Sequence, residues 1–143
     1  MSNSGERLAV IVGGASGIGW AGARALAEHG CRVVIADVNG DAARERAAEL
    51  GAPHSAAAVD VTDETSVQSL FEGLSDGQGI LDIAVNCAGF SNVGLITDMP
   101  AEEFRAVIDV CLNGAFIVSK HAGRHICTGA PLEIGSFLNG NKP

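Results

Sequence analysis

The 143-residue sequence contains no tyrosine, so no phenol in it can serve as an acid or a base. Basic residues are also scarce. Nine Lys and Arg stand against 17 Asp and Glu, which gives a formal net charge of -8 and an isoelectric point near 4.8. Nucleic-acid binding depends on clustered Lys and Arg, so this balance predicts no nucleic-acid partner.

Long apolar runs are missing as well. No stretch approaches the roughly 18 apolar residues that a membrane-spanning helix needs, so we expect no membrane association. Residues 1–7 are polar and only a short apolar run follows, unlike a signal peptide, and this favours a cytoplasmic protein. The composition, 47% hydrophobic and 18% charged, is typical of a globular chain. Its length predicts one domain over residues 1–143.

The cysteines and histidines form no recognisable metal motif. We expect the cysteines, none of which belongs to a CxxC pair, to be buried small hydrophobic residues rather than zinc ligands or disulfides. They are Cys31, Cys87, Cys111 and Cys127. His121 and His125 would share one helix face near a cysteine, but no carboxylate completes a ligand set. We therefore interpret this segment as a partly exposed helix end and predict no metal.

A glycine-rich turn follows the first apolar run. Residues 10–12 are apolar, glycines recur from Gly13 to Gly19, and helical spacing of small apolar residues comes next. A strand, a glycine turn and a helix form half of a βαβ unit, in which the helix N-terminus offers free N–H groups to a phosphate. Glycine lets the backbone approach such a group closely. Glycines also collect in ordinary turns, so the turn alone leaves both interpretations open.

The rest of the chain alternates strand and helix patterns. Apolar runs predict strands at residues 32–37, 56–59, 80–85 and 132–134. Helical patterns fill the intervals, and we expect Thr62 to cap the helix that follows the apolar run at residues 56–59. This alternation predicts an α/β fold of the Rossmann type, a doubly wound parallel sheet in three layers.

A long apolar helical pattern covers residues 104–127, with an interruption expected near Asn113 and Gly114. The pattern is longer than one sheet face requires. Its surplus apolar surface could form a subunit interface and give a homo-oligomer, or the segment could be a core helix with a kink. The sequence leaves these alternatives open.

Asp37 stands at the end of the second predicted strand. A carboxylate there can accept hydrogen bonds from both ribose hydroxyls of an adenosine and repels a 2′-phosphate. The next position, where an arginine could bind that phosphate, is Val38. Asp37 alone could be an ordinary turn residue, but together with the glycine turn it indicates a dinucleotide site that prefers NAD to NADP.

The spacing Gly13-x-x-x-Gly17-x-Gly19 resembles the cofactor motif of the short-chain dehydrogenase/reductase family. Residues 60–61, Asp-Val, are similar to its pair beside adenine, and residues 86–89, Asn-Cys-Ala-Gly, to its Asn-Asn-Ala-Gly motif. The resemblance implies NAD-dependent hydride transfer to or from a small alcohol or carbonyl substrate. The implied cofactor-binding residues are Gly13, Ser16, Gly17, Ile18, Gly19, Asp37, Asp60, Val61, Asn86, Ala88 and Gly89.

Ser136 resembles the catalytic serine at the end of the family's fifth strand, although an ordinary strand-end serine is the alternative. The Tyr-x-x-x-Lys pair that supplies the family's acid and base is absent. We therefore expect the 143 residues to be the N-terminal cofactor-binding portion of such an enzyme, truncated after the fifth strand and inactive alone. The alternative is a non-catalytic dinucleotide-binding or interaction protein with the same fold.

Overall fold

The computed structural model describes residues 7–75 and 80–126, which form a parallel β-sheet flanked by helices. The strands are β1 (Leu8–Val12), β2 (Arg32–Asp37), β3 (Ser55–Ala58) and β4 (Leu81–Asn86), in the order β3-β2-β1-β4. The helices are α1 (Gly17–Glu28), α2 (Gly40–Leu50), α3 (Glu64–Ser75), α4 (Ala101–Ile108) and α5 (Ala115–Ile126), with a π-helical segment, η1 (Asp109–Gly114), between the last two. The predicted doubly wound sheet is confirmed, and the expected strand at residues 132–134 lies outside the described residues.

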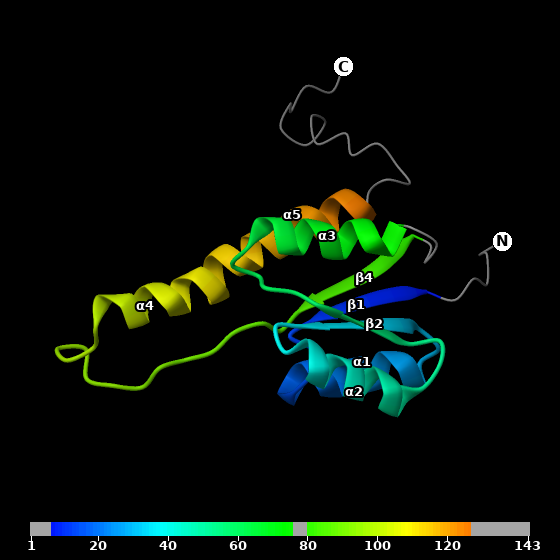
Figure 1. The fold of residues 1–143 in the computed structure, drawn as a ribbon, viewed down its shortest axis with the longest axis horizontal. Coiled ribbons are helices and arrows are strands. Elements are labelled where there is room, and N and C mark those ends of the chain that lie inside the picture. The colour runs from blue at the N-terminus through cyan, green and yellow to red at the C-terminus, as the bar shows by residue number, and fades with distance from the viewer. Residues whose placement is uncertain (1–6, 76–79, 127–143) are drawn as a thin grey trace, which may run out of the picture.

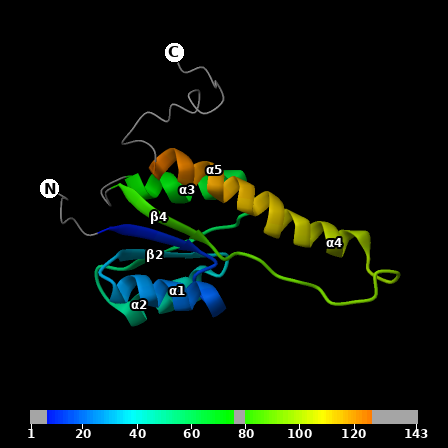
Figure 2. The same cartoon turned by 180° about the vertical axis from the view of Figure 1, so that it is seen from behind.

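The sheet lies between two layers of helices. Helices α1 and α2 cover one face, and α3 and α5 cover the other, as the two opposite views show (Figure 1, Figure 2). Strand β1 is buried along its whole length. Its alternate residues serve the two faces: Val10 packs in the cluster that contains Phe71 of α3, and Ile11 in the cluster that contains Ala23 of α1. A strand buried on both faces accounts for the unbroken apolar run in the sequence.

Parallel pairing brings the carboxyl ends of the strands to one edge. Val12, the last residue of β1, pairs with Ala36 of β2 on one side and with Asn86 of β4 on the other. The glycine turn, Asp37 and the loop after Asn86 therefore all start from the same edge of the sheet. This is the edge at which ligands bind in open α/β sheets.

The helical segment from α4 to α5 is interrupted as the sequence predicted. The interruption is η1, and it ends at Gly114, where an added Cβ would lie 2.7 Å from Cγ2 of Val61. Helix α4 extends beyond the sheet and has no buried residue (Figure 1). Helix α5 packs on the sheet through Val118 and Ala122. The core-helix interpretation is therefore right for α5 and wrong for α4, and a subunit interface stays a prediction.

Helices α3 and α5 are joined by a cluster that corrects the expectation for His121. That ring is buried, not partly exposed at a helix end, and its Nε2 lies 3.1 Å from Oε1 of Glu64. Lys120 donates to the same oxygen at 2.6 Å. Hydrogen bonds from Lys120 and His121 hold the pKa of the Glu64 carboxyl below its usual value. His121 also stacks on the core residue Phe71, so its ring connects the Glu64–Lys120 ion pair to the hydrophobic core.

Other local expectations also need correction. The cap of α3 is Asp63, whose carboxylate accepts the N–H of Thr65 at 2.9 Å, and not Thr62. Of the three cysteines that the structure describes, only Cys31 is fully buried: Cys87 is half-buried and Cys111 is exposed, while Cys127 lies outside the described residues. Across residues 7–75 and 80–126, no helix has both the length and the apolar character needed to cross a membrane.

Candidate cofactor-binding site

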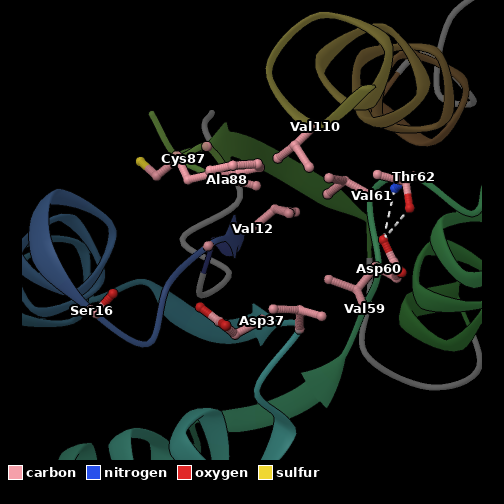
Figure 3. A pocket seen from close by; sticks show the side chains of 14 residues that line it. Val12, Ser16, Asp37, Val59, Asp60, Val61, Thr62, Cys87, Ala88 and Val110 are labelled. Atoms are coloured by element: carbon pink, nitrogen blue, oxygen red, sulfur yellow. Dashed lines mark hydrogen bonds between the residues drawn. The ribbon is translucent and has the colours of Figure 1, made fainter. Parts of the chain in front are cut away.

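A cavity of about 480 Å³ opens at the carboxyl edge of the sheet (Figure 3). Its size is in the range of sites for small molecules and cofactors. The wall consists of short segments that follow β1, β2, β3 and β4, closed by one residue of η1. The lining residues are Val12, Gly13, Ser16, Asp37, Val38, Val59, Asp60, Val61, Thr62, Cys87, Ala88, Gly89, Phe90 and Val110.

The glycine turn is packed tightly against its surroundings. The N–H groups of Gly13 and Gly14 both donate to the carbonyl of Ala36, at 2.8 and 3.1 Å. Gly13 has a φ of +74°, and a Cβ there would lie 2.6 Å from the backbone nitrogen of Ala88. A Cβ on Gly19 would lie 2.0 Å from the carbonyl oxygen of Gly13. Both positions therefore require glycine so that helix α1 can start directly at the sheet edge.

The second glycine of the motif is constrained differently. Gly17 has a φ of +53°, and a Cβ there would meet no atom within 4 Å. Ser16 precedes the helix in an extended conformation, and its side chain makes no capping hydrogen bond. The first turn of α1 thus leaves its N–H groups without a side-chain cap, beside open space, which suits an anion such as a pyrophosphate. Ile18 is 85% exposed and does not line the cavity.

Asp37 connects the glycine turn to the next helix. Its Oδ2 accepts the N–H of Ala15 at 3.1 Å, and its Oδ1 accepts the N–H of Asn39 at 3.0 Å. These bonds fix the carboxylate in the cavity wall (Figure 3). Each carboxylate oxygen can accept more than one hydrogen bond, so both remain able to accept from a ribose hydroxyl. Val38 beside it is 75% exposed and brings no positive charge.

The segment after β3 forms the wall next to Asp37, whose carbonyl accepts the N–H of Val59 at 2.9 Å. Oδ1 of Asp60 accepts hydrogen bonds from the hydroxyl and the N–H of Thr62, at 2.7 and 2.9 Å (Figure 3). The first of these is the main reason that the pKa of Asp60 lies below its usual value. Val61 is buried against Gly114 and presents an apolar surface to the cavity. The ionised Asp60 can therefore accept a hydrogen bond from an adenine amino group, while the neighbouring Val61 packs on the adenine ring.

The segment after β4 lines the cavity beside the end of β1. The side chain of Asn86 accepts the N–H of Ala88 at 3.2 Å, and the N–H of Cys87 donates to Val12 at 2.7 Å. Asn86 itself does not line the cavity, whereas Ala88 and Gly89 do. Its role in the structure is to shape the loop that closes over the end of β1.

The structure thus brings most of the sequence-predicted site residues to one cavity. Gly17, Ile18 and Gly19 form the first turn of the neighbouring helix, and Ser136 lies outside the described residues. The sequence interpretation missed Val59, Phe90 and Val110 as wall residues. Val59 directly follows β3, and that position is a usable signal for an α/β edge, whereas Phe90 stands further along the loop after β4. Val110 carries no such signal, because it reaches the cavity only through the path of α4 and η1.

Comparison with known proteins agrees with this geometry. Residues 13–140 match the protein family described as Enoyl-(Acyl carrier protein) reductase. Cis-4-hydroxycyclohexanecarboxylate dehydrogenase of Sinomonas cyclohexanicum is 40% identical over 139 residues, which cover 93% of this chain and 56% of that protein. Sorbitol dehydrogenase of Cereibacter sphaeroides is 36% identical over 133 residues, covering 93% and 51%. The crystal structure of gox2181 superposes with a TM-score of 0.82 at 35% identity, covering 85% of this chain and 49% of that one.

The parallel sheet, the glycine turn and the cavity at its carboxyl edge are the features of a dinucleotide-binding oxidoreductase fold. With the family match and these relatives, they establish that the chain belongs to the short-chain dehydrogenase/reductase family, whose members bind NAD or NADP. The chain corresponds to the N-terminal portion and spans about half the length of these two relatives.

Proposed function

We propose that this chain binds NAD in preference to NADP and is the cofactor-binding portion of an oxidoreductase acting on a small alcohol or carbonyl compound. The observation that carries the proposal is the Asp37 carboxylate, held in the cavity wall by the glycine turn, with Val38 and no cation at the next position. A 2′-phosphate at this point would meet a fixed negative charge, whereas two ribose hydroxyls would meet an acceptor. When bound, the nicotinamide of NAD supplies the hydride acceptor.

The described residues divide the binding task among three segments. The uncapped first turn of α1 at Gly17 suits the pyrophosphate, Asp37 the adenosine ribose, and the pair Asp60 and Val61 the adenine. Gly13 and Gly19 do not need to contact the cofactor for this, because they set the close packing that places the helix N-terminus. Hydride transfer further requires an acid or base, which in the family is a tyrosine. We therefore propose that the 143 residues alone bind the cofactor without turning it over.

The chain provides its own probe for testing the preference. Trp20 is its one tryptophan and there is no tyrosine, so energy transfer from Trp20 to bound NADH can be followed without other emitters. NADH and NADPH carry the same nicotinamide, and their titrations differ only through the 2′-phosphate. We expect NADH to bind at least about tenfold more tightly, since one close charge repulsion near a protein surface costs on the order of 1–4 kcal/mol. Equal affinities for the two would contradict the proposal.

A further inference from the structure

Arg46 of α2 reaches out of its own helix to the glycine turn. Its Nε donates to the carbonyl oxygen of Ala15 at 3.2 Å. Two other contacts fix the guanidinium: its Nη1 donates to Oε2 of Glu49 at 2.8 Å, and its Cζ lies 4.9 Å from the ring centroid of Trp20. Arg46 therefore joins α2, α1 and the turn. A planar guanidinium held by an ion pair and a ring face loses little further freedom when it donates a third contact.

The two peptide groups that flank Ala15 are each held by a different side chain. The N–H of Ala15 donates to Asp37 at 3.1 Å, while its carbonyl accepts from Arg46. Ala15 is only 6% exposed, so these polar groups depend on protein partners more than on water. The Arg46 side chain is 40% exposed and reaches this buried segment from the surface. Asp37 and Arg46 thus bind two different polar groups of the same turn residue, Ala15.

We propose that Arg46 is a positioning residue for the dinucleotide. By holding the Ala15 carbonyl it keeps the Ala15 N–H on Asp37, and so keeps the carboxylate in the orientation that meets the adenosine ribose. The inference rests on the proposed NAD binding. Without the guanidinium, no donor among the described contacts reaches the Ala15 carbonyl, so the turn can rotate and the carboxylate loses one of its two anchors.

Arg44 provides the matched control. It lies on the same helix and makes the same kind of ion pair three residues apart, with Asp41, as Arg46 makes with Glu49. Among the described contacts, none joins Arg44 to the glycine turn. If Arg46 merely stabilised α2, then Arg44→Met and Arg46→Met would have similar effects, because both remove one exposed ion pair and place a good helix former in the chain.

The test compares NAD affinities by calorimetry. We expect Arg46→Met to weaken NAD binding about fivefold, the loss that follows from removing one partly exposed charged hydrogen bond, and Arg44→Met to change it less than about twofold. Arg46→Gln serves as the second substitution, with the same expectation. In an Asp37→Ala background, Arg46→Met should change the affinity less than about twofold, because the anchor through which it acts is already absent. Trp20 emission should change in Arg46→Met and not in Arg44→Met.

Three results would overturn the inference. In the first, the unsubstituted chain binds NAD, and Arg46→Met and Arg46→Gln change the NAD affinity by less than about twofold. This result would leave the proposed function standing. Another is a fivefold loss that persists in the Asp37→Ala background, which would show that Arg46 does not act through the carboxylate. Absence of NAD binding by the unsubstituted chain would contradict the proposed function together with the inference.

Discussion

The substitution Asp37→Ala is expected to remove most of the preference for NAD over NADP. It deletes the acceptor for the ribose hydroxyls, so NADH affinity should fall on the order of 10- to 100-fold, as for loss of charged hydrogen bonds. It also deletes the charge that opposes a 2′-phosphate, so NADPH affinity should stay or rise. The ratio of the two dissociation constants, measured by energy transfer from Trp20, should come to within about threefold of one.

Two further variants separate the causes of that change. Asp41→Ala removes an acid from the neighbouring helix, where it pairs with Arg44 at the surface, and should leave the ratio unchanged. Asp37→Asn keeps an acceptor oxygen and removes the charge, so it should improve NADPH binding while costing less NADH affinity than alanine does. An Asp37→Ala variant that retained the original preference would rule out this residue as its source.

Gly19→Ala should destabilise the fold and abolish cofactor binding. The added methyl would lie 2.0 Å from the oxygen and 2.9 Å from the carbon of the Gly13 carbonyl, and both atoms belong to the backbone of the glycine turn. Relief requires α1 to move off the turn. We expect the free energy of unfolding, measured with urea, to fall by about 3 kcal/mol or more, at the upper end of the cost of overpacking.

Gly22→Ala is the matched control in the same helix. A Cβ at Gly22 would meet no atom within 4 Å, and the residue lies in the interior of α1. Replacing glycine by alanine in a helix interior without a clash should raise the free energy of unfolding by about 0.5–1 kcal/mol. The two substitutions should therefore have opposite signs. A Gly19→Ala variant as stable as Gly22→Ala would refute the close-packing role of Gly19.

The sequence predicted the sheet and the segments that meet at its carboxyl edge, because both depend on local patterns. Buried strands appear in the sequence as short apolar runs that stop at a turn residue or an acid. Strand β1 is followed by Gly13, and β2 ends with Asp37. Parallel pairing then brings those ends together without further information. The family resemblance added the roles expected of Asp60 and Asn86, which composition and periodicity do not carry.

What the sequence could not predict depends on contacts between distant segments. His121 is buried because Glu64, more than fifty residues earlier, gives its ring a partner across two helices. Val110 joins the cavity wall because Gly114 lets η1 approach Val61. The cap of α3 was misplaced by one residue for a different reason: Thr62 and Asp63 are both good capping residues, and only the backbone path decides between them.

The most direct test of the central claim is a crystal structure of this chain with NAD. We expect the adenosine ribose hydroxyls to lie within hydrogen-bonding distance of Asp37, the pyrophosphate at the first turn of α1 beside Gly17, and the adenine against Val61. A dinucleotide bound away from the carboxyl edge, or bound there with its ribose hydroxyls turned away from Asp37, would contradict that claim.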